Sequence, residues 1–153
     1  AEADTEEQLR AQLKRLLESQ KMTEQEAECI RIRDIRRFVE SGLGQRMKKA
    51  AMKKHLYREQ PFVIQRNASM LDDGWKNETV LVQGIIDAYF MEGDEIVLVD
   101  YKTDRVRRGQ EQKLINLYHV QLEDYARALE RMTGKRVKEK IIYSFTLQKE
   151  ILL

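Results

Sequence analysis

The chain has 153 residues, which is enough for one domain with a full hydrophobic core. Charged residues make up 35% of the chain, but their signs nearly cancel to a net charge of +2. A nucleic-acid surface would therefore have to come from local clusters of Lys and Arg. The only cysteine, Cys29, excludes an intramolecular disulfide and a four-cysteine iron–sulfur cluster held within this chain, and it favours a reducing, intracellular setting.

No membrane or export signal is expected. No apolar run approaches the ~18–20 residues needed to span a bilayer, and the acidic N-terminus does not resemble a signal peptide. Because the chain begins with Ala1 rather than Met, we expect it to be a piece of a longer polypeptide.

Residues 1–55 are predicted to form an N-terminal helical part. Leucines at helical spacing predict an amphipathic helix from about residue 4 to residue 20. Two further short helices are expected after it, the second ended by Gly42, and a short basic helix follows.

Residues 56–153 show a different period, typical of strands, and are predicted to form a β-β-β-α-β core. The first strand contains the only proline, which favours either an edge strand or a bent strand. The predicted elements are strands at 56–65, 78–91 and 95–103, a helix at 110–133 ended by Gly134, a strand at 137–145, and a short strand at 149–153. This order predicts an α/β (α+β) fold, a single domain in which helices flank a central mixed sheet.

The hairpin formed by the second and third strands places acidic residues together. If Gly93 and Asp94 are the central pair of its turn, the numbers of facing residues add up to 187. Asp87 then faces Asp100, with Cβ atoms ~5 Å apart, whereas a three- or five-residue loop would shift this pairing. Lys102 lies two residues beyond Asp100 and therefore on the same face.

Two adjacent carboxylates repel each other, so this arrangement requires a positive partner. A hard divalent cation such as Mg²⁺ or Mn²⁺ suits carboxylate oxygens, and a neighbouring lysine can orient or deprotonate an attacking water. The cluster therefore predicts metal-assisted phosphodiester hydrolysis. The alternative is an ordinary salt bridge at the end of a sheet, which is the usual explanation of an arbitrary D-x-K pair. The apolar strand before Asp100 and the register with Asp87 favour a nuclease site over an ordinary salt bridge.

Three segments in this order resemble the nuclease domain of the RecB family in the PD-(D/E)xK superfamily: VQGIID at 82–87, VLVDYKTD at 97–104, and a Q-x-x-x-Y pattern at 121–125. Residues 44–47 (GQRM) and 58–62 (REQPF) add a closer resemblance to the C-terminal domain of the AddA family of bacterial helicase–nucleases. The resemblance implies a restriction-endonuclease-like core.

The resemblance also implies roles for particular residues. Asp87 and Asp100 would be metal ligands, the Tyr101 carbonyl would complete the shell, and Lys102 would be the catalytic lysine. Glu59 is either a further acidic site residue or an ordinary charge on a strand surface, and the second interpretation is slightly favoured.

Gln121 and Tyr125 lie four residues apart on one helix face and, by the same resemblance, would orient the lysine or contact DNA near the site. For Tyr125 the alternative is core packing with its helix neighbours. Directly after the D-x-K strand, Arg105, Arg107 and Arg108 are well placed to meet DNA phosphates.

Two departures from the family pattern are clear. The G-T-x-x-H motif that supplies a further metal ligand is absent, and neither His55 nor His119 matches its position. We therefore expect the chain to begin after the histidine helix and its metal site to be incomplete. There is also no complete P-loop, because Thr133-Gly134-Lys135 lacks the first glycine and the Ser/Thr, so no ATP site is expected in this chain.

The resulting hypothesis is a Mg²⁺- or Mn²⁺-dependent exonuclease domain that cuts single-stranded DNA from an unwound duplex. The resemblance implies a helicase–nuclease of the bacterial cytoplasm that processes double-strand breaks together with an AddB-like partner and without a membrane partner. The rival is a non-catalytic fragment that docks DNA or protein and lacks a complete metal site. A Cas4-like exonuclease is disfavoured by the single cysteine.

Overall fold

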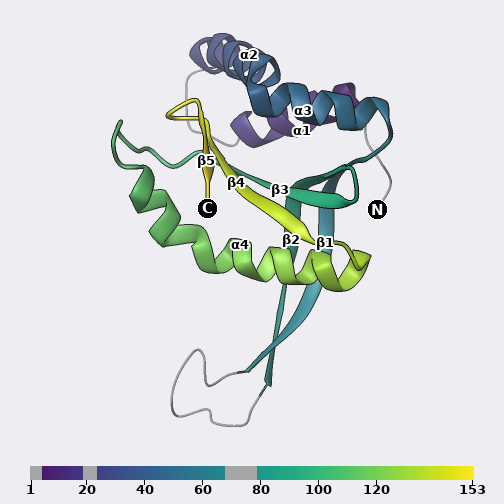
Figure 1. The fold of residues 1–153 in the computed structure, drawn as a ribbon. Coiled ribbons are helices and arrows are strands. Elements are labelled where there is room, and N and C mark those ends of the chain that lie inside the picture. The colour runs from purple at the N-terminus through teal and green to yellow at the C-terminus, as the bar shows by residue number, and fades with distance from the viewer. Residues whose placement is uncertain (1–4, 19–23, 68–78) are drawn as a thin grey trace.

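The structure is a computed structural model that describes residues 5–18, 24–67 and 79–153 (Figure 1). The described residues form four helices and five strands. Their bounds are α1 Glu6–Glu18, α2 Glu24–Glu40, α3 Gly42–Met52, β1 Leu56–Asn67, β2 Thr79–Glu92, β3 Glu95–Lys102, α4 Glu111–Thr133, β4 Val137–Ser144 and β5 Lys149–Leu152.

The five described strands form one mixed sheet in the order β1-β2-β3-β4-β5. Only β3 and β4 pair in parallel, and α4 is the helical crossover between them. Helices α1 to α3 lie over one face of the sheet and α4 over the other (Figure 1). The predicted α+β architecture, with helices flanking a central mixed sheet and β1 at its edge, is confirmed. The division of the chain at residue 55 stays a prediction.

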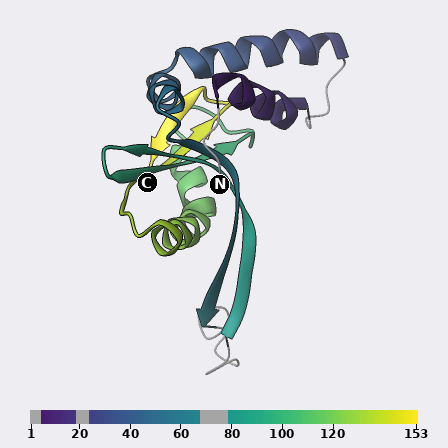
Figure 2. The ribbon, with the colours of Figure 1, turned by 90° about the vertical axis from the view of Figure 1, so that its right-hand side faces the viewer.

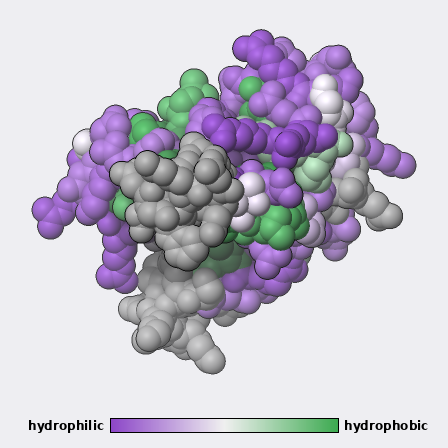
Figure 3. Space-filling view, turned by 90° about the horizontal axis from the view of Figure 1, so that it is seen from below, coloured by the Kyte–Doolittle hydropathy of each residue, from purple (hydrophilic) through white to green (hydrophobic). Residues whose placement is uncertain are grey.

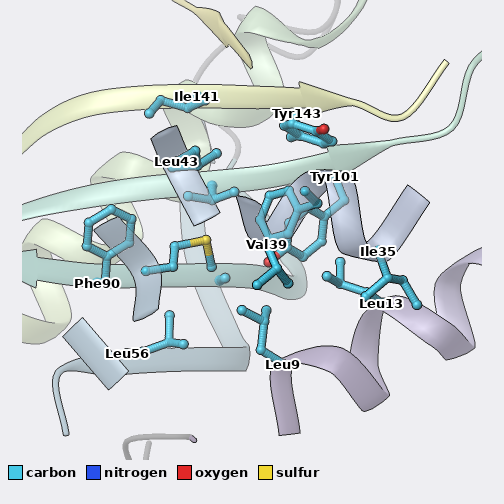
Figure 4. Close-up of a cluster of buried hydrophobic side chains, with 14 of the residues drawn as sticks. Leu9, Leu13, Ile35, Val39, Leu43, Leu56, Phe90, Tyr101, Ile141 and Tyr143 are labelled. Carbon is cyan, nitrogen blue, oxygen red and sulfur yellow. The ribbon is translucent and has the colours of Figure 1, made fainter. Parts of the chain in front are cut away.

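A hydrophobic core lies on each side of the sheet. On the side of α1 to α3, Phe38 packs edge-on against Tyr143 with ring centroids 4.7 Å apart. Leucines from α1 and α3 belong to the same buried cluster, in which Leu9, Leu13, Leu43 and Tyr143 are labelled in Figure 4. On the other side, Leu122 and Leu129 of α4 are fully buried against the sheet. Strand alternation divides β3 between the two cores, so that Asp100 and Lys102 belong to the face that α4 covers.

Strands β1 and β2 continue beyond the body of the protein as a long two-stranded ribbon (Figures 1 and 2). Glu59 of β1 has a φ of 50° and interrupts the regular alternation of the strand. On the outer face of the ribbon, Val63, Leu81 and Ile85 remain exposed. The surface seen from below is mostly hydrophilic, with a few hydrophobic areas (Figure 3).

The helical first third differs from the sequence prediction in one respect. The two short helices expected after α1 form one helix, α2, and Gly42 begins α3 rather than ending a helix. Ser41 explains the difference, because its Oγ accepts a hydrogen bond from the N–H of Gly44 at 3.1 Å and so caps α3. No helix among the described residues is long and apolar enough to cross a membrane.

Candidate active site

The β2–β3 hairpin has the predicted register. Its turn lies at Gly93–Asp94, and the five paired positions, from Glu92–Glu95 to Ala88–Val99, all add up to 187. The ladder ends one pair before Asp87 and Asp100. There the backbone N–H of Tyr101 donates a hydrogen bond to Oδ2 of Asp87 at 2.9 Å. The side-chain carboxylate of Asp87 thus takes the place of a backbone acceptor on β2.

Asp100 is the most buried carboxylate of the cluster, with 3% of its surface exposed. Lys102 Nζ lies 2.8 Å from its Oδ2 and forms an ion pair with it. This contact lacks the alignment of a hydrogen bond, and no other described residue donates one to Oδ2. The two neighbouring carboxylates of Asp87 and Asp100 carry more negative charge than this one ammonium offsets, which makes their oxygens candidate ligands for a cation.

Burial and the negative charge of Asp100 raise the pKa of Asp87 to about 7. The hydrogen bond from Tyr101 and the charge of Lys102 act in the opposite direction but do not offset these effects. The two carboxylates therefore share a site in which the charge of one disfavours the charge of the other, as expected of a pair that binds a divalent cation.

The oxygen atoms at this place suit Mg²⁺ or Mn²⁺. In an extended strand the N–H and C=O of one residue point to the same side. Since the N–H of Tyr101 points to Asp87 and the carbonyl of Lys102 accepts from Phe145 on the opposite side, the Tyr101 carbonyl faces β2. Among the described residues no group of three or more His, Cys, Asp and Glu side chains could hold a metal ion. Two carboxylates and one carbonyl fit an ion that keeps several waters.

Lys102 is held by α4. Its Nζ donates to Oε1 of Gln121 at 3.0 Å, which places this predicted site residue beside the lysine. The ammonium also lies 4.0 Å from the ring centroid of Tyr118, and Tyr118 Oη donates to Asp104 Oδ2 at 2.6 Å. Tyr118 was not among the site residues predicted from the sequence. Its spacing of i, i+3 from Gln121 on one helix face is the signal that could have placed it beside the lysine.

Tyr125 lies in the core below the site. It is 8% exposed and packs edge-on against Phe62, with ring centroids 5.0 Å apart. Burial, followed by the charges of Asp100 and Asp87, raises its pKa to about 12. Tyr125 therefore packs in the core, as the alternative interpretation predicted, but its aromatic contact is with Phe62 of β1 rather than with a neighbour on its own helix. A role of Tyr125 in cleavage stays a prediction.

A cavity with a volume of about 650 Å³ opens beside Asp87 on the side of α1. Gln12 and Glu59 line it together with Asp87 and Tyr101. Nε2 of Gln12 donates to the backbone carbonyl of Asp87 at 2.9 Å, and Arg15 binds Glu59 at 2.7 Å. Gln12 was not among the residues predicted from the sequence. A polar residue among the buried leucines of α1 was the available signal.

The three predicted DNA-binding arginines, Arg105, Arg107 and Arg108, are exposed on the segment between β3 and α4. This segment is held by Val106, which is buried, and by the hydroxyl of Thr146, which donates to the carbonyl of Asp104 at 2.6 Å. The structure does not bring the three arginines into the carboxylate cluster, and their contact with DNA stays a prediction. His55 and His119 are exposed and outside the cluster.

The mixed sheet and the Asp–Asp–Lys cluster at its centre define a class of protein: the chain belongs to the PD-(D/E)XK nuclease superfamily, whose family model matches residues 1–151. Within this class, the chain is similar to bacterial ATP-dependent helicase/nuclease subunits of the AddA type. It is 38% identical over 150 residues to the protein of Clostridium novyi (strain NT), 44% over 144 residues to that of Acetivibrio thermocellus, and 41% over 141 residues to that of Thermoanaerobacter sp. (strain X514).

These matches cover 95%, 91% and 90% of the chain, but only 12%, 11% and 11% of the relatives' own length. The chain thus corresponds to a small part of each relative, and the resemblance to the nuclease domain of a helicase–nuclease is confirmed.

Proposed function

We propose that the chain is a metal-dependent DNA nuclease domain that hydrolyses phosphodiester bonds of single-stranded DNA. The observation that carries this proposal is the pair of neighbouring carboxylates of Asp87 and Asp100, which one ion pair with Lys102 does not neutralise. Asp87, Asp100 and the Tyr101 carbonyl would hold Mg²⁺ or Mn²⁺. The bound ion would supply positive charge to the phosphate and lower the pKa of a water.

The side chains around the ion have separate tasks in this proposal. Lys102 orients the attacking water through its ammonium group, and Gln121 keeps this ammonium directed at the cluster. Tyr125 supports this helix face from the core. Arg105, Arg107 and Arg108 contact phosphates of the strand that enters the site.

The wider setting is inferred from the relatives. Their name and the small fraction of their length that the chain matches support an AddA-type helicase–nuclease as the parent protein. In such a protein the domain would act as an exonuclease during double-strand-break processing, with an AddB-like partner, in the bacterial cytoplasm. ATP-driven unwinding would reside in other parts of the polypeptide.

A second candidate function is non-catalytic docking of DNA or protein. It is favoured by one observation: in the described part of the chain no third His, Cys, Asp or Glu joins the carboxylate pair. A calorimetric titration with Mn²⁺ separates the two candidates. Heat of binding that disappears in Asp100→Ala supports the nuclease, and its absence together with inertness on single-stranded DNA supports docking.

The decisive experiment measures cleavage of labelled single-stranded DNA with Mg²⁺ or Mn²⁺, by this chain and by the full-length protein that contains it. Asp87→Ala, Asp100→Ala and Lys102→Ala should each abolish cleavage. The matched control is Asp94→Ala, since Asp94 lies in the turn of the same hairpin and pairs with Lys135 outside the cluster. Full cleavage by any of the three site variants would overturn the assignment.

A further inference from the structure

A second cavity lies between the distal part of β1 and α4. Its volume is about 480 Å³, and it shares no lining residue with the cavity beside Asp87. Three arginines line it, Arg66 from β1 and Arg127 and Arg131 from α4, together with Asp124 and Glu130. Three positive and two negative charges leave a local net charge of +1.

Arg66 is held in place from within the protein. Its side chain is 15% exposed, and Nη2 donates to Oδ1 of the buried Asp124 at 3.0 Å. Nε of the same guanidinium is buried and has no acceptor among the described residues. Asp124 therefore fixes the orientation of the guanidinium but leaves one donor that a further anion could use.

Arg127 and Arg131 are exposed and lie four residues apart on α4, so their like charges repel. No ion pair joins either of them to a described acidic residue, and Glu130 between them is not paired with them either. Asp124, Arg127 and Arg131 follow a spacing of i, i+3 and i+7, which places them on one face of the helix. An anion bound there would relieve the repulsion and meet the unused donor of Arg66.

The same helix carries the residue that contacts Lys102. With a rise of 1.5 Å per residue, Arg127 lies about 9 Å and Arg131 about 15 Å from Gln121 along the helix axis. This separation is in the range of a few nucleotides of one strand. A strand bound at the carboxylate cluster could therefore reach the arginines without leaving α4.

We propose that Arg66, Arg127 and Arg131 form a subsite for a backbone phosphate of the DNA strand, a few nucleotides from the bond that is cut. This proposal rests on the proposed nuclease function. A phosphodiester carries one negative charge, which matches the local charge of +1, and its oxygens suit the planar guanidinium donors. The arginines would hold the strand without reading its sequence.

The test is binding of fluorescent oligodeoxythymidylates by this chain in the presence of a chelator, so that binding is measured without cleavage. For single strands, each neutralised phosphate adds about 0.7 to the slope of log Kd against log salt concentration. Because the subsite holds one phosphate, the Arg127→Ala/Arg131→Ala double variant should lower the slope by about 0.7, and each single variant should lower it by part of that amount. The loss of affinity should be larger for a long oligonucleotide than for one too short to span the two sites.

Two further variants keep the test independent of folding. Arg66→Lys retains the ion pair with Asp124 but removes Nε, and should weaken binding of the long oligonucleotide. Arg36→Ala is the matched control, because Arg36 is an exposed arginine on α2, over the opposite face of the sheet, and pairs with Glu40. Its salt slope should equal that of the unchanged chain.

An unchanged salt slope in the Arg127/Arg131 double variant would overturn the subsite, whether or not the chain cleaves DNA. Loss of binding to polyglutamate with unchanged binding to DNA would also overturn it and would point to an acidic protein segment. Failure of cleavage alone, with the predicted change of slope, would instead count against the proposed nuclease function.

Discussion

The backbone N–H of Tyr101 donates a hydrogen bond to the carboxylate of Asp87 where the next β2–β3 pair would lie. A side chain thus replaces a backbone partner at the point where the two strands separate. This bond holds the carboxylate beside Asp100 although the charges of the two disfavour each other. The pair is therefore fixed by strand geometry rather than by mutual attraction.

The first prediction concerns Asp87→Asn. The amide oxygen can still accept from Tyr101, while the repulsion with Asp100 is removed. Because the pKa of Asp87 is raised to about 7, the metal-free protein should lose stability as pH rises from about 4 through 7, since the unfolded chain releases this proton more readily. The variant should lack this loss, so its melting temperature relative to the parent should increase over that range. Thermal unfolding with a chelator measures the difference.

Added metal should reverse this difference in melting temperature between the unchanged chain and Asp87→Asn. Mn²⁺ should raise the melting temperature of the unchanged chain above pH 7 and should leave Asp87→Asn almost unaffected, because binding to the folded state stabilises it. If the variant gained as much from Mn²⁺ as its parent, Asp87 would not be a ligand.

The second prediction concerns Gln121, which accepts a hydrogen bond from Lys102 Nζ. Gln121→Ala should lower the rate of DNA cleavage by about 10–100-fold, the usual effect of removing a residue that orients a site group. Gln121→Glu retains the acceptor and should restore part of the rate. Gln112→Ala is the control, since Gln112 bonds to Asn116 on the exposed surface of the same helix. Wild-type rates in Gln121→Ala would show that Lys102 needs no such partner.

The third prediction separates the two contacts of Tyr118. Tyr118→Leu removes the ring beside the Lys102 ammonium together with the bond to Asp104, and should reduce kcat by about 5–30-fold, which corresponds to about 1–2 kcal/mol for a largely buried cation–π contact. Tyr118→Phe keeps the ring but loses the bond to Asp104, so it should mainly raise KM by loosening the arginine-bearing segment. Steady-state cleavage kinetics measure both constants. Identical behaviour of the two variants would argue for a purely structural role.

The central part of the site could be predicted because it depends on short-range geometry. The turn at Gly93–Asp94 fixes the register of β2 and β3, and strand alternation then places Lys102 beside Asp100. Contacts between distant segments could not be predicted from the sequence in the same way. Gln12 reaches the carbonyl of Asp87 only because α1 folds back over the sheet, and Arg66 meets Asp124 only because α4 crosses β1.

Gly42 shows a second limit. A glycine after an apolar stretch is typical of a helix end, but the same local sequence contains Ser41, whose side chain caps the following helix instead. The Ser41 cap decided between the two signals, and the close approach of α3 to the end of α2 lies at Gly44 rather than at Gly42. A Cβ atom on Gly44 would lie 2.1 Å from the carbonyl oxygen of Phe38 and 2.7 Å from that of Val39.

The last prediction follows from this contact. Gly44→Ala should destabilise the protein by about 3 kcal/mol, because backbone atoms of α2 cannot move aside as a flexible side chain would. At about 2–4 °C per kcal/mol for a chain of this size, the melting temperature should fall by about 6–12 °C. Gly42→Ala is the matched control, since a Cβ there meets no atom within 4 Å and alanine has the higher helix propensity. It should leave the melting temperature unchanged or slightly raised. Equal melting temperatures for the two alanine variants would mean that α2 and α3 can separate at no cost, and that Gly44 does not set their distance.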